Sequence, residues 1–128
     1  MSDPALDPIA PDAWMRAVLA NLPGASAAVK EEWGATRFLV ADKMFGLLGT
    51  DGGGNRVLTL KGLPANNAVL RAQHPGITPG YYMNKTHWVS LRLGDDAPPL
   101  ALAEELLAES YRLVVAGLPK RLRDGLTA

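Results

Sequence analysis

The residues of this sequence that could contact a polyanion lie in its middle third. Between positions 37 and 92 there are seven lysines and arginines against two aspartates, although the whole chain has a formal net charge of zero. Binding responds to local potential more than to total charge, so this excess predicts a polyanion-binding surface. Cations neutralise phosphates, and a neighbouring aromatic ring can stack on a base. The candidate contacts are Lys43, Arg56, Lys61, Lys85, Trp88 and Arg92.

Motifs that suggest catalysis have simpler structural explanations. The glycines at 52–54 lead into a strand rather than into a lysine and a helix, which indicates a hairpin loop and not a phosphate-binding loop. Tyr81 and Lys85 have the Tyr-x-x-x-Lys spacing of short-chain dehydrogenases, but no dinucleotide-binding fingerprint precedes them. No serine lies in a nucleophile elbow, and the acidic pairs are adjacent residues that diverge or are solvated. We therefore expect no enzymatic activity and no cofactor.

Metal sites and membrane segments are not expected either. The chain has no cysteine, and its two histidines are thirteen residues apart, which argues against zinc sites and excludes disulfides. No apolar run approaches the roughly 18 residues of a membrane helix, and the first residues lack the positive region of a secretory signal. The expected location is therefore the cytoplasm, with no metal and no membrane partner. The sequence leaves the oligomeric state open.

The elements that would position the candidate residues follow from hydrophobic periodicity. Apolar residues at helical spacing predict helices near 11–22, 64–74 and 98–118. Between 27 and 93 the period shifts towards two and turn residues interrupt it, which predicts an antiparallel sheet of four or five strands. The second and third strand segments are either separate or one continuous bent strand. The segments lie near 27–33, 37–41, 43–49, 56–62, 80–84 and 87–93.

Strands flanked by helices, without regular β-α-β alternation, predict an α+β fold of the two-layer sandwich type, an antiparallel sheet with helices on one face. The length of 128 residues suits a single domain, placed at 11–128 after a flexible N-terminal arm at 1–10. Trp33 is expected in the core. Side-chain alternation groups further residues on the sheet face that the helices leave bare. These residues are Thr59, Lys61, Trp88, Ser90 and Arg92.

Several short motifs follow one another along the chain. They are Trp33-Gly34, Lys43-Met44-Phe45, Leu58-x-Leu60-Lys61, Tyr82-Met83-Asn84-Lys85, His87-Trp88-Val89, and Ser110-Tyr111 before Leu118-Pro119-Lys120. In this order and spacing they resemble the MmcQ/YjbR family of small bacterial proteins. The resemblance covers roughly residues 13–123.

The resemblance implies a CyaY-like fold and DNA binding, which has been proposed for the family through a double-wing arrangement. The chain matches the family's lysine-bearing motifs at Lys43, Lys61 and Lys85 and its tryptophan at Trp88. It departs at Asp42, where the family often has glycine, so a negative charge adjoins Lys43. The related frataxin-type proteins bind iron through an acidic ridge on the first helix. This chain lacks that ridge, which disfavours iron delivery.

The function expected from the sequence is weak, sequence-tolerant DNA binding through the basic sheet face and hairpin loops. An alternative is a protein-interaction or small-ligand adaptor that uses the same face, with Tyr81, Tyr82 and Trp88 as its main contacts. Charge reversal separates the two functions. Glutamate at positions 61 and 85 abolishes polyanion binding, whereas loss of the Trp88 ring harms an adaptor more.

Overall fold

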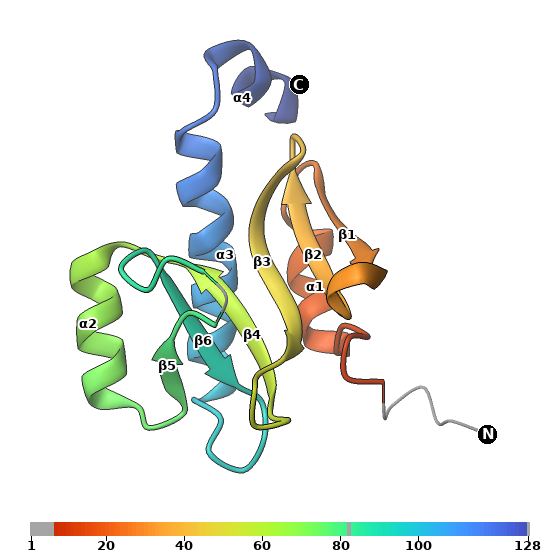
Figure 1. Ribbon diagram of the computed structural model, residues 1–128. Coiled ribbons are helices and arrows are strands. Elements are labelled where there is room, and N and C mark those ends of the chain that lie inside the picture. The colour runs from red at the N-terminus through yellow and green to blue at the C-terminus, as the bar shows by residue number, and fades with distance from the viewer. Residues whose placement is uncertain (1–6, 82, 128) are drawn as a thin grey trace.

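The computed structural model describes residues 7–81 and 83–127, which form an α+β fold (Figure 1). The strands are β1 (Ala25–Lys30), β2 (Ala35–Val40), β3 (Lys43–Thr50), β4 (Arg56–Lys61), β5 (Ile77–Pro79) and β6 (Trp88–Arg92). The helices are α1 (Ala13–Ala20), α2 (Pro64–Gln73), α3 (Leu100–Ala116) and α4 (Lys120–Thr127), with a short 3-10 helix η2 (Glu31–Trp33). Within the described residues, six strands form one antiparallel sheet in the order β1-β2-β3-β4-β6-β5. The predicted fold class is confirmed.

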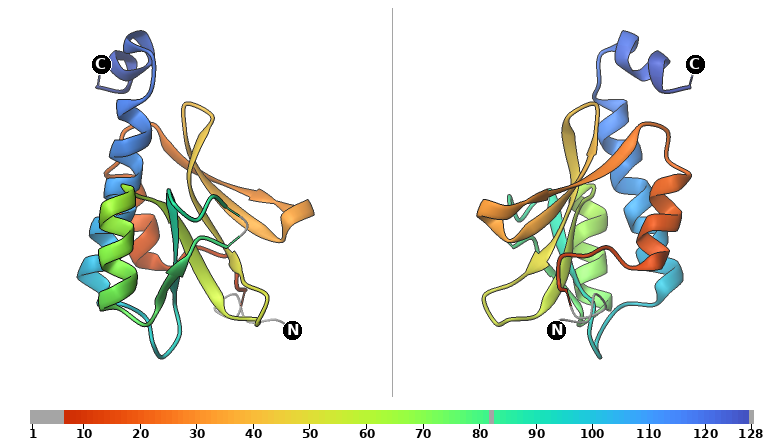
Figure 2. Two further views of the ribbon diagram at one scale, coloured as in Figure 1. Left: turned by 60° about the vertical axis from the view of Figure 1, so that its left-hand side comes forward. Right: turned by 90° about the vertical axis from the view of Figure 1, so that its right-hand side faces the viewer.

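Helices α1 and α3 cover one face of the sheet and enclose the core. Leu107, Tyr111 and Val114 recur at helical spacing, so they form one buried stripe along α3. Met15 and Leu19 provide the buried side of α1. Figure 2 shows both helices on the same side of the sheet, whereas the ends of β1 and β2 near η2 project away from them. The predicted two-layer arrangement, with one sheet face free of helices, is therefore confirmed.

A two-residue turn separates β2 from β3, so these strands form a hairpin rather than one bent strand. Ala41 and Asp42 have φ angles of 48° and 64°, the left-handed values that a tight hairpin turn requires. A bulge follows, because Phe38 pairs with Gly46 whereas Leu39 pairs with Met44. The extra residue changes which side of the sheet the start of β3 faces.

The strand predicted at 80–84 is wrong. The strand in this region is β5, which ends at Pro79 and pairs with β6 along the edge of the sheet. Beyond Gly80, residue 81 and residues 83–87 lie outside the strand pairing. The backbone N–H of Tyr81 donates to the Ser90 hydroxyl at 2.9 Å. The Ser90 hydroxyl therefore takes the place of the backbone carbonyl that a neighbouring strand would offer to Tyr81. Tyr81 is a residue type common in strands, yet it does not lie in one here.

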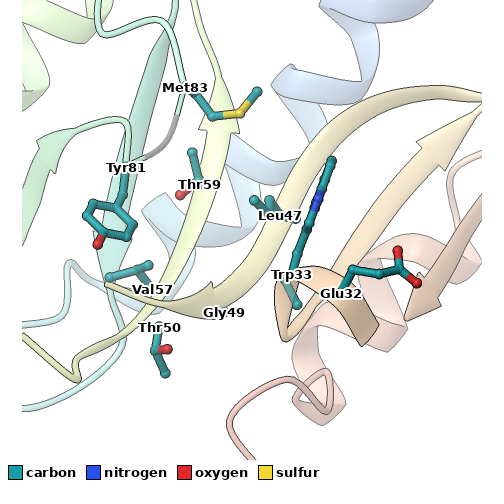
Figure 3. Close-up of a pocket in the computed structure, with 10 residues that line it drawn as sticks. Glu32, Trp33, Leu47, Gly49, Thr50, Val57, Thr59, Tyr81 and Met83 are labelled. Atoms are coloured by element: carbon teal, nitrogen blue, oxygen red, sulfur yellow. The ribbon is translucent and has the colours of Figure 1, made fainter. Parts of the chain in front are cut away.

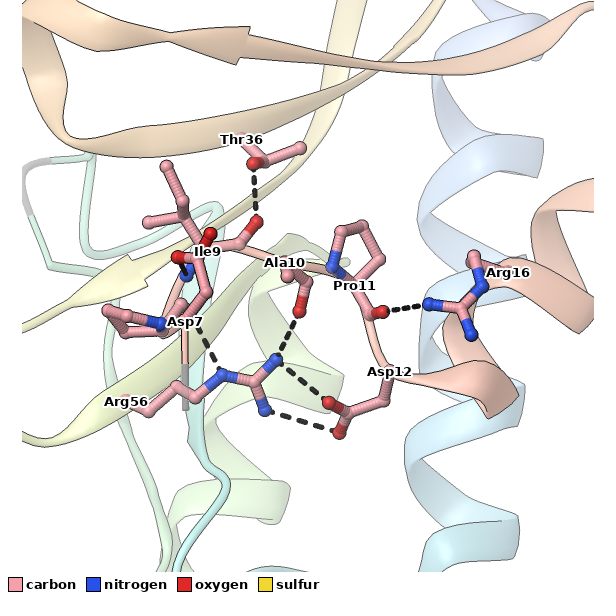
Figure 4. Close-up of polar contacts among 9 residues, drawn as sticks. Asp7, Ile9, Ala10, Pro11, Asp12, Arg16, Thr36 and Arg56 are labelled. Carbon is pink, nitrogen blue, oxygen red and sulfur yellow. Dashed lines mark hydrogen bonds and ion pairs between the residues drawn. The ribbon is translucent and has the colours of Figure 1, made fainter. Parts of the chain in front are cut away.

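The last residues of the predicted arm are fixed to the sheet (Figure 4). The Arg56 guanidinium donates to the carbonyls of Pro8 and Ala10 at 2.9 and 2.8 Å, and it pairs with the Asp12 carboxylate at 2.9 Å. The Thr36 hydroxyl donates to the carbonyl of Ile9. The arm was predicted to be flexible over 1–10. Residues 1–6 lie outside the described residues, and the part that begins at residue 7 is held by these contacts.

The C-terminal end forms a short helix, α4, after the break at Gly117 and Pro119. Lys120 pairs with Asp124 one turn later, at 2.7 Å. None of the helices among the described residues has the length and apolar character needed to cross a membrane.

Candidate functional site

The bare face of the sheet collects residues that are distant in the sequence. Lys61 pairs with Trp88, Thr59 with Ser90 and Val57 with Arg92. Directly paired residues of antiparallel strands share a face. Leu58 and Leu60, which alternate with these residues, are buried on the helix side. The sequence prediction that places Thr59, Lys61, Trp88, Ser90 and Arg92 on one face is thus confirmed.

This face is not flat and open along its whole length. The residues on either side of position 82, 80–81 and 83–87, here called the covering loop, are anchored to it. The Thr59 and Ser90 hydroxyls are 2.7 Å apart in a hydrogen bond, and both residues are almost fully buried. Because Ser90 also accepts the Tyr81 N–H, the loop is fixed to the centre of the face through a satisfied polar pair.

Between the covering loop and η2 lies a cavity of about 400 Å³ (Figure 3). Tyr81 and Met83 flank it on the loop side, and Trp33 flanks it on the η2 side. Leu47, Val57 and Thr59 form its floor on β3 and β4. The remaining lining residues are Glu32, Ala35, Gly49 and Thr50. The cavity is therefore mostly apolar, with aromatic rings on two sides.

Trp33 is presented by the short helix η2 rather than buried in the core. Gly34 ends η2 at a φ of 59°, a left-handed conformation that glycine adopts at little cost. Trp33 is 55% exposed, so the sequence prediction that it belongs to the core is wrong. The Lys30 ammonium lies over its ring at 5.4 Å from the centroid, a cation–π contact that restrains the indole.

Tyr81 is held by contacts on its backbone and its ring. Its N–H donates to Ser90, as described, and its phenol oxygen lies against the backbone of Gly52 in the hairpin loop between β3 and β4. A Cβ at position 52 would be only 2.9 Å from this oxygen, so glycine permits the approach. Tyr82 was named with Tyr81 in the adaptor hypothesis, but it lies outside the described residues.

The hairpin loop beside Tyr81 is organised by Asp51. The Asp51 carboxylate accepts the backbone N–H groups of Asn55 and Gly53, each at 2.9 Å. These bonds, first that from Asn55, lower the pKa of Asp51, and the nearby Arg92 acts in the same direction. The predicted hairpin is confirmed, and its carboxylate serves the loop's own backbone.

Three cations of this region have no carboxylate partner among the described residues: Arg37, Lys61 and Lys85. Arg37 pairs with Leu47, so it stands on the bare face beside the cavity floor. Lys61 follows Thr59 on the same face of β4. Lys85 is exposed on the covering loop, with its ammonium 3.5 Å from the Gly80 carbonyl. The contacts predicted from the sequence do not include Arg37. The alternation of side chains along β2 would have placed it on the bare face.

The other predicted contacts lie elsewhere or are already engaged. Lys43 pairs with Val40, a core residue, and therefore stands on the helix side of the sheet at the tip of the β2–β3 hairpin. Arg56 is engaged with the arm. Arg92 shares the bare face but forms an ion pair with Asp96 at 3.0 Å. Trp88 is partly buried where the covering loop rejoins the sheet, with its Cβ close to Gly80.

The site has no arrangement typical of a metal centre. Among residues 7–81 and 83–127, no three histidines or carboxylates are grouped so that they could hold a metal ion. In the same residues, neither the Thr59 nor the Ser90 hydroxyl is hydrogen-bonded to a histidine or a carboxylate. The geometry thus favours binding of a planar or apolar group flanked by cations.

The sequence of this chain is similar to the sequences of known proteins. A family model described as YjbR matches residues 20–113. The uncharacterized protein YbdF of Escherichia coli O157:H7 is 37% identical over 84 residues, which are 66% of this chain and 67% of that protein. The uncharacterized protein YjbR of Escherichia coli K12 is 32% identical over 101 residues, 79% of this chain and 84% of that protein.

Two solved structures are also similar. The Deinococcus radiodurans protein DR2400, described as a DUF419 domain, superimposes with a TM-score of 0.75 at 35% identity, covering 88% of this chain and 84% of that chain. A Pseudomonas syringae protein superimposes with a TM-score of 0.62 at 25% identity, covering 70% of this chain and 86% of that chain.

Proposed function

Because the chain belongs to the YjbR family, we propose that it binds DNA weakly and without strong sequence preference through the bare sheet face, and that it catalyses no reaction. The observation that carries this proposal is that Arg37 and Lys61 stand on the bare face and Lys85 on the covering loop, and that none of them is paired with a described carboxylate. Unpaired cations on one surface attract phosphates through counterion release, a contribution that does not depend on base sequence.

The proposal narrows the set of contacts that the sequence suggested. Lys61 and Lys85 are retained and Arg37 is added. Lys43 stands on the opposite side of the sheet, and Arg56 would have to abandon the arm to reach a phosphate. Arg92 would have to exchange Asp96 for a phosphate. Trp88 is partly buried, whereas Trp33 is exposed. Trp33 therefore replaces Trp88 as the candidate for stacking on a base.

Charge reversal on the two sides of the sheet tests the proposal. Binding of a fluorescent duplex of random sequence is measured by anisotropy at about 0.05 M salt. Lys61→Glu should weaken binding by at least about tenfold, because one phosphate contact contributes a salt-dependence slope near −0.9. Lys43→Glu is the matched control, since it makes the same charge change on the helix side and should have a much smaller effect.

The proposal fails if wild-type protein binds neither duplex nor single-stranded DNA at low salt, or if the two variants weaken binding equally. The second result would mean that only net charge matters and that the bare face is not the site. Circular dichroism of each variant confirms that the fold is retained, which is expected because neither ammonium contacts a carboxylate within the described residues.

The cavity itself favours a second function, that of a small-ligand adaptor. Its volume of about 400 Å³ lies within the range of about 300–1,000 Å³ that is usual for small-molecule sites, and its lining is mainly apolar. An uncharged ligand would depend on Trp33 and Tyr81 and not on Lys61. Lys61→Glu therefore separates the two functions, because it should leave the affinity for a neutral aromatic compound unchanged.

A further inference from the structure

Resting on the proposed function, we infer that the cavity between Trp33 and Tyr81 accepts one unpaired base, so that single-stranded nucleic acid is preferred over a duplex. The two rings approach the cavity from segments 48 residues apart in the sequence, one on η2 and one on the covering loop. Aromatic side chains that line a groove next to cations are the usual platform for single strands, since every base has a face that can stack.

The lining suits the flat face of a ring. Leu47 and Val57 offer apolar surface on the floor, and Met83 offers a polarisable thioether on the loop side. Thr59 adds a hydroxyl at the floor, although its hydrogen bond to Ser90 is already formed. The volume of about 400 Å³ is near the lower end of the small-molecule range, which allows for one base and not for a stacked run.

The cations around the cavity can contact the backbone on either side of the inserted base. Arg37 lies in the same cross-strand row as Leu47 and Thr59, and Lys61 lies one step further along β4. The Arg37 Nε atom is buried, but the residue as a whole is only partly buried, so a phosphate would be met by the outer part of its guanidinium. On the η2 side, Lys30 lies over Trp33 and is paired with Glu32 at 3.3 Å, so its charge is already compensated there.

A duplex cannot use the cavity in the same way. Its bases are paired and stacked inside the helix, and a base must be flipped out, at a cost of a few kcal/mol, before it reaches an aromatic pocket. The bare face would then hold a duplex by phosphate contacts alone. The cavity therefore adds affinity for a single strand and none for a duplex.

The test compares a fluorescent single-stranded 12-mer, its duplex, and a 12-mer of abasic sites that keeps the phosphates. Trp33→Ala should weaken binding of the normal single strand by about five- to 150-fold, the range that corresponds to one stacked base. Binding of the duplex and of the abasic strand should change less than twofold. Trp33→Phe, which keeps an aromatic face, should recover most of the lost affinity.

Leu100→Ala is the matched control, because Leu100 is a large apolar residue with a similar exposed fraction, 53% against 55%, at the start of α3. It should not alter binding of any probe. Competition with adenosine monophosphate separates the two sources of a base. A mononucleotide that binds as tightly as the 12-mer would overturn the preference for a strand.

The failures of this inference and of the proposed function are distinguishable. If the abasic strand binds as tightly as the normal strand, or if Trp33→Ala weakens duplex and single strand equally, base insertion is overturned while DNA binding stands. If none of the three probes binds at low salt, the proposed function is overturned as well.

Discussion

The Thr59 and Ser90 hydroxyls determine where the covering loop lies. Each residue stands on the bare face, where a hydroxyl would ordinarily be hydrated, yet both are nearly inaccessible. Their mutual hydrogen bond leaves Ser90 able to accept the Tyr81 N–H, so three polar groups are satisfied without water. The position of the Tyr81 ring beside the cavity is thus a consequence of two small side chains on neighbouring strands.

Tyr111 connects the core to the chain after α1. Its ring packs edge-on against Phe45 at 5.7 Å between centroids, and its hydroxyl donates to the Pro23 carbonyl. Tyr111→Phe keeps the ring but removes this donor, and we expect the free energy of unfolding in urea to fall by about 1 kcal/mol at pH 7. Ser26→Ala, at an exposed position of β1, is the control and should not change it.

The same residue predicts a pH dependence. Burial raises the pKa of the Tyr111 phenol above its ordinary value near 10. A raised folded-state pKa means that this group's contribution to stability is complete below pH 10 and is lost as the pH rises through the folded-state value. The difference in unfolding free energy between wild type and Tyr111→Phe should therefore shrink in strongly alkaline solution. A difference that grows there would contradict this assignment.

The arm and the sheet are joined mainly by Arg56. Its guanidinium bridges two arm carbonyls and the Asp12 carboxylate at the start of α1, although it stands at the first position of β4. The arm thus closes over the sheet end nearest the 51–55 loop. Arg56 is a candidate DNA contact by sequence, but its guanidinium already donates to groups within the chain.

Arg56→Ala should release the arm. We expect faster amide exchange at residues 9 and 10 and a loss of about 1–2 kcal/mol in unfolding free energy, since the pair with Asp12 is only partly screened by solvent. Duplex DNA affinity should stay within about twofold, because the Arg56 guanidinium is turned to the arm and Asp12 and makes none of the proposed phosphate contacts. Arg112→Ala, which breaks ion pairs on the far side of α3, is the control for exchange in the arm. A large loss of DNA affinity in Arg56→Ala would restore Arg56 as a contact.

A net charge of zero does not make every surface of this protein neutral. On α3, Arg112 is paired with both Glu105 and Glu109, at 2.7 and 2.8 Å, so the acidic residues of the helix layer are partly neutralised within that layer. On the bare face, Arg37 and Lys61 have no such partners among the described residues. A polyanion would therefore meet a local positive potential on a neutral protein.

This distribution predicts the salt dependence of binding. If Arg37, Lys61 and Lys85 each neutralise one phosphate, the logarithm of affinity should fall with the logarithm of salt concentration at a slope of about −2.7 for a duplex and about −2.1 for a single strand. Lys61→Ala should reduce the duplex slope by about 0.9. Titrations between 0.05 and about 0.3 M salt measure both values. A slope near zero would exclude the phosphate contacts.

Features that depend on local periodicity are predictable from the sequence. Alternation in β4 and β6 assigned Leu58 and Leu60 to the helix side and Lys61 and Trp88 to the bare face, because consecutive residues of any strand point to opposite sides. The helical spacing of Leu107, Tyr111 and Val114 likewise fixed the buried side of α3. The order of short motifs indicated the family.

Contacts between segments far apart in the sequence depend on tertiary packing and are not predictable in this way. One extra residue in the β2–β3 hairpin turns Lys43 to the helix side, and no local pattern shows such a bulge. Trp33 is exposed because η2 ends in a left-handed glycine, and the covering loop leaves the sheet because Ser90 offers Tyr81 an acceptor. The cavity forms only where η2, the strands and the covering loop come together. Its walls are residues far apart in the sequence, and no local pattern predicts how they pack.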